Sequence, residues 1–222
     1  MHARTLALTC LSLCFLTVLL TLDFSHRIAP VAAAANPVIP AAYAPLDDAY
    51  APAYDKDGNL TPPLQYREWI YLTSGLDMSY APKASADMSM FDNVFVNPEA
   101  YRAFVATGTW PDKTVMVLET RGAESKGSIN KSGHFQSGGL MGLELHVKDE
   151  SRFPGKWAFF DVASESKATP FPQTAACYTC HQQHAAVDTT FVQFYPTLLP
   201  IAKQKNTLSA NYRNESASEG QK

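Results

Sequence analysis

Short stretches in the middle of the chain alternate apolar and polar positions or form brief apolar runs. Four of them are rich in β-branched and aromatic residues: MFDNVFV from Met90, TVMVLETR from Thr114, LMGLELHVKD from Leu140 and KWAFFDVA from Lys156. This pattern predicts β-strands, and the turn-forming residues between neighbours favour antiparallel pairing. The sequence therefore predicts an α+β fold that is mainly an antiparallel β-sheet with flanking helices.

One helix is predicted before the first of these strands, and a second between the first and the second strand. REWIYLTSGL, from Arg67, has an amphipathic pattern that favours a helix. PEAYRAFVATG predicts a second helix, with Asn97 as its N-cap, Pro98 in its first turn and Gly108 at its end. Residues 122–139 are polar and glycine-rich, which predicts a long flexible hairpin loop.

The first 35 residues have the layout of a secretory signal peptide. A basic start precedes an apolar stretch at residues 5–22, and small residues follow at 32–35. A retained membrane anchor is the alternative, because the apolar stretch approaches the roughly 20 residues that a spanning helix needs. Its Thr, Ser and Cys content and the alanine run favour cleavage. We therefore expect an exported, periplasmic protein.

The remainder is long enough for one domain with its own core. Residues 36–65 are rich in Ala, Pro, Tyr and Asp and predict an extended lead-in, residues 66–202 predict the folded domain, and residues 203–222 predict a flexible tail. The whole chain carries 18 basic and 21 acidic side chains and no basic block, which argues against a nucleic-acid partner.

Two of the four cysteines lie in the predicted signal peptide, so the exported chain keeps only Cys177 and Cys180, in the sequence CYTCH. A thioredoxin-like redox pair would lie beside a strand–helix–strand pattern, and the residues before Cys177 have none. A zinc site could use both thiols with His181 or His184, but structural zinc sites normally have a second ligand pair. Covalent haem attachment, for which C-x-x-C-H is the signature, is the interpretation that we favour.

A helical turn at this motif would place both cysteines and the histidine on one face, at i, i+3 and i+4. Cys177 and Cys180 would then hold one haem, and His181 would ligate its iron. No methionine follows His181, and His184 lies on the same predicted helix, so a usual trans ligand is missing nearby. An open sixth position is therefore predicted. The upstream residues that could close it are Met78, Met88, Met90, Met116, Met141, His134 and His146.

Aromatic residues are predicted to form an apolar pocket above the iron. These residues are Phe91, Phe95, Phe135, Trp157, Phe159 and Phe160. Such a pocket favours small uncharged ligands, because burying a charge in it costs several kcal/mol.

The residues after the motif allow two interpretations. His184, Asp188, Phe191 and Tyr195 continue from the motif at helical spacing. In one interpretation, Asp188 or a main-chain carbonyl orients an imidazole, as outer groups do for ligating histidines. In the other, which we favour, the helix packs Phe191 and Tyr195 into the core and ends at the following proline.

An ordered set of motifs resembles the cytochrome P-460 family: FDNVFVNPEAYRAF, GTWPDKTVMVLE, KGSINKSGHFQ, VKDESRFPGKWAFFDV and CYTCHQQHAAVDTTFVQFYPTL. The resemblance spans roughly residues 66–200. It implies a mainly antiparallel-sheet protein, often a homodimer, with one c-type haem bound through a C-terminal C-x-x-C-H. For this chain it implies that Cys177 and Cys180 hold the haem and that His181 is the proximal ligand.

The resemblance implies two function classes. One is an enzyme that oxidises hydroxylamine or a similar small nitrogen compound and passes electrons to a soluble carrier. The other is a non-catalytic cytochrome that binds nitric oxide or carbon monoxide, or transfers electrons. Family enzymes link a lysine to the porphyrin, but TVMVLE has Leu118 where we would look for it, and Lys113 and Lys148 are the nearby candidates.

Oxidation also requires a base near the iron. The available titratable groups are His134, Glu119 and Glu144. The alternative for each is an ordinary role in a loop or on the polar face of a strand, which residue type alone favours.

The signal peptide makes a direct prediction about the mature protein. Its amino-terminal sequence should begin near Ala35 or Asn36, because the small residues before that point form the cleavage site. Edman sequencing of the purified protein measures this. Recovery of an intact Met1 end from the membrane fraction would establish the anchor instead.

Overall fold

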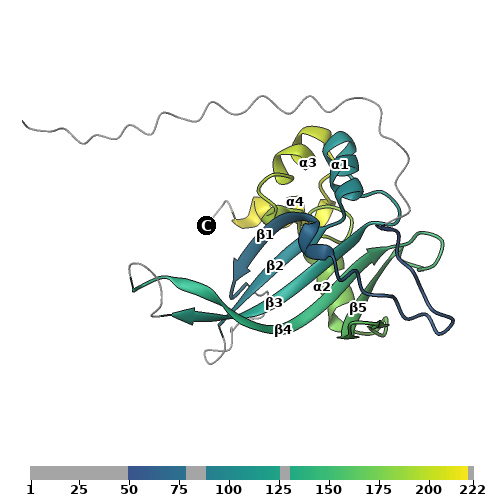
Figure 1. Ribbon diagram of the computed structural model, residues 1–222. Helices are drawn as coiled ribbons and strands as arrows, with labels where there is room; N and C mark the ends of the chain where they lie inside the picture. Colours follow the sequence, from purple (N-terminus) through teal and green to yellow (C-terminus); the bar gives the residue numbers. More distant parts are fainter. Residues whose placement is uncertain (1–49, 79–88, 126–130, 220–222) are drawn as a thin grey trace, which may run out of the picture. The chain divides into compact units, whose positions relative to one another are not determined.

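The computed structural model describes residues 50–78, 89–125 and 131–219 (Figure 1). Its centre is an antiparallel sheet in which each strand pairs with the next in sequence, in the order β1-β2-β3-β4-β5-β6. The strands are β1 (Ile70–Leu76), β2 (Met90–Val96), β3 (Val115–Ser125), β4 (His134–Lys148), β5 (Trp157–Ser164) and β6 (Lys167–Pro170). The α+β class with a mainly antiparallel sheet is thus confirmed.

The four stretches predicted as strands correspond to β2, β3, β4 and β5. The helix predicted from Arg67 is wrong. Only a single 3₁₀ turn, η2 (Tyr66–Glu68), precedes Trp69, and from Ile70 the chain pairs with β2 as the edge strand β1. Pairing with a neighbouring strand decides the conformation of such a short amphipathic stretch, because its own helical preference is small.

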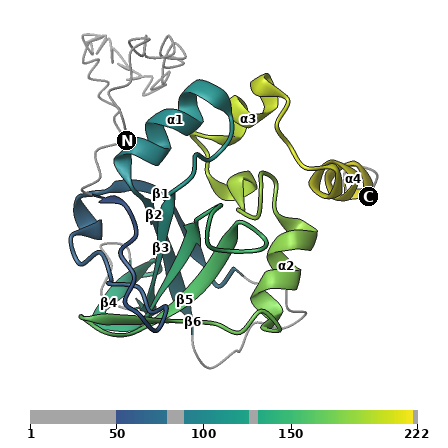
Figure 2. The same cartoon turned by 90° about the vertical axis from the view of Figure 1, so that its right-hand side faces the viewer.

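The strand period divides the central strands between two faces of the sheet. Met116 and Trp157 point to the face on which the helices lie, where they pack with α1 (Pro98–Thr107) and α3 (Leu199–Lys205). Figure 2 shows α1 and α3 side by side at one end of the sheet, and α2 (Ala176–His184) beside the sheet. Val117 and Phe160 point to the opposite face, where a second core forms.

Helix α1 confirms the start, the first-turn proline and the end that were predicted for it. Pro98 lies in its first turn, and Gly108 ends it in a left-handed conformation with φ of 80°. Asn97 occupies the N-cap position, as predicted, but its side chain makes no capping hydrogen bond. Its Oδ1 instead accepts a hydrogen bond of 2.9 Å from the backbone N–H of Val115, at the start of β3. Asn97 therefore ties the helix start to the sheet.

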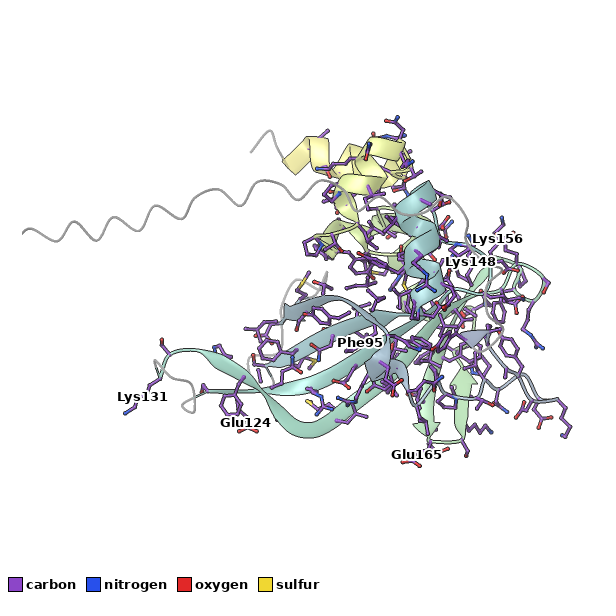
Figure 3. The ribbon with its side chains drawn as sticks, turned by 45° about the horizontal axis from the view of Figure 1, so that its top comes forward. Phe95, Glu124, Lys131, Lys148, Lys156 and Glu165 are labelled. Carbon is purple, nitrogen blue, oxygen red and sulfur yellow. The ribbon has the colours of Figure 1, made fainter. Side chains whose placement is uncertain are left out.

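The hairpin between β3 and β4 is longer, and its loop shorter, than the sequence predicts. Glu124 pairs with Phe135 and Ser125 with His134, so polar residues of the predicted loop continue the strands. Figure 3 shows Glu124 and Lys131 near the far end of this hairpin, which projects from the body of the domain. Backbone pairing across a hairpin does not need apolar side chains, and for this reason hydropathy alone underestimates its length.

The predicted lead-in and tail both contain ordered structure. Residues 36–49 of the lead-in lie outside the described residues, but Leu60 is buried and exchanges two backbone hydrogen bonds with Ala168 of β6. Within the segment expected to be a flexible tail, residues Ala210–Glu219 form helix α4. Over the parts of the chain that are described, no helix is both long enough and apolar enough to span a membrane.

Candidate functional site

Helix α2 (Ala176–His184) carries the C-x-x-C-H motif in the predicted conformation. Cys177, Cys180 and His181 therefore occupy positions i, i+3 and i+4, which are neighbours on one face of the helix. Both thiols are free and half-buried, and burial raises the pKa of each above its ordinary value. A raised pKa keeps the thiols protonated at neutral pH, which is the opposite of what a reactive redox pair needs. Among the described residues, no group of three or more His, Cys, Asp or Glu side chains is arranged to hold a metal ion.

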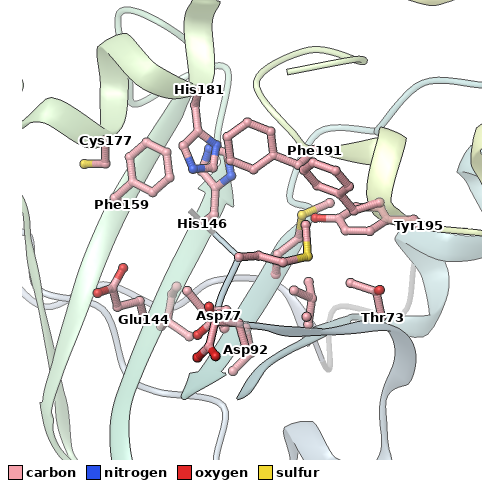
Figure 4. Close-up of a pocket in the computed structure, with 18 residues that line it drawn as sticks. Thr73, Asp77, Asp92, Glu144, His146, Phe159, Cys177, His181, Phe191 and Tyr195 are labelled. Carbon is pink, nitrogen blue, oxygen red and sulfur yellow. The ribbon is translucent and has the colours of Figure 1, made fainter. Parts of the chain in front are cut away.

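A cavity of about 520 Å³ lies between α2 and the helix-facing side of the sheet. This volume is in the usual range for a cofactor site. Cys177, His181 and Phe159 bound it on one side, while Thr73 and Asp92 of β1 and β2 lie on the opposite side (Figure 4).

The imidazole of His181 is fixed in a single tautomer. Its Nδ1 donates a hydrogen bond of 2.7 Å to the backbone carbonyl of Thr189. A carbonyl can only accept, so the proton is on Nδ1 and the lone pair is on Nε2. Burial lowers the pKa of His181, so the ring is neutral at neutral pH. A neutral imidazole with an oriented, unprotonated Nε2 is the form that binds a metal.

The chain after α2 does not continue as the predicted helix. The helix ends at His184, and Asp188 takes a left-handed conformation with φ of 51°. The side chain of Gln193 bonds the backbone where the helix stops, because its Nε2 donates to the His184 carbonyl at 2.7 Å and its Oε1 accepts from the Ala186 N–H at 3.0 Å. The chain can thus turn back and present the Thr189 carbonyl to His181. The predicted helical stripe is wrong, while the alternative of a main-chain carbonyl orienting an imidazole fits this geometry.

Among the upstream residues that could ligate the iron, His146 of β4 directly contacts His181. Its ring is buried, stacks on Phe159 at 4.0 Å and meets the His181 ring edge-on at 5.1 Å. Two imidazoles on opposite sides of one metal would need ring centres about 6 Å apart on a common axis, given metal–nitrogen bonds of about 2 Å. His146 therefore stands beside His181 and cannot lie trans to it. Burial, followed by the nearby His181, lowers the pKa of His146 well below its ordinary value, so it too is neutral.

The other upstream candidates divide by position. Met78 and Met116 line the cavity. His134 and Met141 are exposed on the projecting hairpin, Met90 is not among the lining residues, and Met88 lies outside the described residues. Of these remaining candidates, Met78 and Met116 are therefore the described ones that could approach a metal on His181.

Of the six aromatic residues predicted around the iron, Phe159 alone lines the cavity. Phe95 and Phe160 point to the opposite face of the sheet and pack in its second core. Phe191, Phe194 and Tyr195, from the irregular segment after α2, take the predicted places. The side of a sheet that a residue faces depends on register, which composition does not give.

The candidate bases separate in the same way. Glu144 lines the cavity, and burial, followed by the charges of Asp161 and Asp92, raises its pKa. Glu119 lies on the neighbouring strand but on the opposite face of the sheet. His134 is exposed on the hairpin. Only Glu144 among the three candidates is in reach of a ligand in the cavity.

Glu119 instead belongs to a buried polar network. Its carboxylate accepts hydrogen bonds from Tyr66 and from Arg121 Nε, the latter at 2.6 Å, and pairs with Arg67. Burial alone would raise the pKa of Glu119, but the hydrogen bonds from Arg121 and Tyr66 outweigh it and lower the pKa.

Neither candidate lysine reaches the cavity. Lys113 pairs with Asp149 at 2.6 Å, and Lys148 donates to the Trp110 carbonyl at 2.7 Å. No lysine of the described residues lines the cavity.

Comparison with known protein families finds a match, which covers most of the elements described above. Residues 63–192 match the family described as Cytochrome P460, a span that runs from before β1 to the segment after α2. No curated protein matches the chain.

The network around Glu119 predicts a pH-dependent loss of stability in Glu119→Gln. Since the folded-state pKa lies below the unfolded one, the ionised carboxylate stabilises the fold above the unfolded pKa, and this contribution disappears as the pH falls through the acid range. The variant should lose about 2–3 kcal/mol at pH 7, because it leaves buried donors without an ionised partner. Denaturant unfolding from pH 7 to pH 3 should find this difference shrinking. Glu124→Gln, an exposed change on the same strand, is the matched control. An equal loss at both pH values would contradict the assignment.

Proposed function

Because the chain belongs to the cytochrome P460 family, and is therefore a haem cytochrome, we propose that it carries one covalently attached haem and acts on small nitrogen compounds such as hydroxylamine or nitric oxide. In this proposal Cys177 and Cys180 hold the haem, and His181 ligates the iron through Nε2. The protein is exported to the periplasm and exchanges electrons with a soluble carrier.

One observation carries the proposal: His181 lines the cavity with its Nδ1 occupied by the Thr189 carbonyl. Its Nε2 is then the nitrogen left for a metal. Cys177 lines the same cavity, and Cys180 follows one helical turn later. Two thiols three residues apart followed by a histidine are the signature of covalent haem attachment, and here they lie beside a cavity of about 520 Å³.

A bound haem would supply the redox change and an axial position for a small ligand. The protein supplies an asymmetric environment for that ligand. Phe159, Phe191 and Phe194 contribute apolar side chains to the lining of the cavity. Asp92 and Glu144 line the same cavity on the side away from His181 (Figure 4). Since the pKa of Glu144 is raised, its carboxyl group can hold or accept a proton closer to neutral pH than an exposed glutamate could. Neutral or cationic ligands are favoured over anions by these carboxylates.

A non-catalytic gas-binding or electron-transfer cytochrome is the second candidate. The positions of Lys113 and Lys148 favour it, because both lysines are engaged away from the cavity. The absorption spectrum of the pure protein separates the two candidates. A lysine cross-link would shift and broaden the main haem band, whereas a plain c-type haem would keep the ordinary band.

Covalent attachment is tested by replacing both thiols. The Cys177→Ala/Cys180→Ala variant should lose all haem staining on a denaturing gel of periplasmic extract, because no thiol remains to form a thioether bond. Each single variant is the matched control and should keep part of the staining through the remaining cysteine. A double variant that still stains would end the proposal of a c-type haem.

The open axial position is tested with the reduced protein. It should have the spectrum of a high-spin, five-coordinate haem and bind carbon monoxide and nitric oxide, since no protein ligand has to be displaced. Met78→Leu and Met116→Leu should have the same reduced spectrum, because neither sulfur ligates the iron. A low-spin wild-type spectrum that carbon monoxide leaves unchanged, and that turns high-spin in one of these variants, would identify that methionine as the sixth ligand and the protein as an electron carrier.

A further inference from the structure

A second buried histidine lies against the predicted iron ligand, and its polar atoms require an explanation. His146 is 8% exposed and is enclosed by aromatic rings: Phe159 stacks on it at 4.0 Å, and Trp157 lies 4.4 Å away. A phenylalanine would fill such a place without the cost of burying ring nitrogens. The imidazole is therefore expected to make a hydrogen bond that a hydrocarbon ring could not replace.

That hydrogen bond goes to Thr189. His146 Nε2 lies 3.2 Å from Thr189 Oγ1, and the backbone carbonyl of the same threonine accepts the 2.7 Å hydrogen bond from His181 Nδ1. One residue thus contacts both histidines, with its side chain on one and its carbonyl on the other. His146 and Thr189 are 43 positions apart in the sequence, and the contact joins β4 to the segment after α2.

The turn around Thr189 is held on its other sides as well. Asp188 has a φ of 51°, and the N–H and the hydroxyl of Thr190 both donate to the Val187 carbonyl, at 2.9 and 2.8 Å. Trp110 Nε1 donates to Thr190 Oγ1 at 2.8 Å. These contacts fix the ends of the turn, whereas the side chain of Thr189 hydrogen-bonds to His146. The peptide that carries the Thr189 carbonyl is thus constrained by the turn on one side and by His146 on the other.

We propose that His146 is a positioning residue which, through Thr189, sets the direction and strength of the hydrogen bond to His181. The inference rests on the proposed ligation of iron by His181. A strong hydrogen bond at Nδ1 increases the basicity of Nε2, and outer groups of this kind tune the metal that a histidine binds. His146 would in this way adjust the bond between His181 and the iron without touching the iron itself.

Two isosteric variants test this role in the haem-loaded protein. His146→Phe keeps the aromatic stack but removes both ring nitrogens, and Thr189→Val keeps the shape of the threonine but removes its hydroxyl. In each, a less constrained Thr189 carbonyl should weaken the hydrogen bond to Nδ1. The iron–histidine stretching frequency of the reduced protein, measured by resonance Raman spectroscopy, should shift downward, and the reduction potential should shift upward. The double variant should shift no further than the larger single one, because both changes remove the same contact.

His146→Gln is the rescue variant, since its amide can still hydrogen-bond the Thr189 hydroxyl, and it should return the frequency toward the wild-type value. Thr169→Val, on the exposed edge strand β6, is the matched control and should shift neither quantity. Unchanged frequency and potential in Thr189→Val, which is the least disruptive change, would overturn the inference while leaving the proposed function intact. Wild-type protein without stained haem, or without an iron–histidine band, would overturn the proposed function and the inference with it.

Discussion

The hydrogen bond from His181 Nδ1 to the Thr189 carbonyl is the contact on which the arrangement of the site depends. For Thr189 to reach back to His181, α2 must stop within one turn of the motif, and the chain must reverse through the left-handed Asp188. The same reversal sends the next residues along the cavity, where Phe191 becomes a lining residue. A continued helix would have carried that ring away from His181. The orientation of one imidazole and the shape of the cavity wall therefore have a common cause.

Strand register imposes a second constraint, because it assigns each residue of the sheet to the cavity or to the opposite core. Leu118 pairs with Glu144, and Glu119 pairs with Leu143, so two glutamates on adjacent strands point in opposite directions. One of them lines the cavity with a raised pKa, while the other is enclosed by Tyr66, Arg67 and Arg121 with a lowered one. Two residues of the same type thus differ in their chemistry because a single-residue change of position reverses the face.

Local patterns in the sequence predict the parts of the molecule that depend on local physics. The strands β2 to β5, helix α1 with its left-handed Gly108 and the helical C-x-x-C-H motif all follow from spacing and residue type. The errors fall where distant residues decide. The segment from Ile70 becomes a strand because β2 lies beside it, and the residues after His184 leave the helix because Gln193 and Thr189 bond back to α2. The place of His146 beside His181 could not be read from the sequence, since nothing local marks a contact made across 43 positions.

Helix α2 is held in place by contacts on two sides. None of the residues of α2 is fully buried, but Tyr178 and His181 pack against the ring of Phe159 on the sheet. Polar contacts add to this packing: the Phe159 N–H donates to the Tyr178 hydroxyl on the sheet side, and His184 lies 3.1 Å from the carboxylate of Glu215 on the side of α4. Ser209, just before α4, adds a 2.7 Å hydrogen bond to the Ala185 carbonyl. Both Ser209 and Glu215 lie beyond the residues 63–192 that match the family. Residues on both sides of the end of the matched span therefore hold α2 in place: Phe159 from within it, and Ser209 and Glu215 from beyond it.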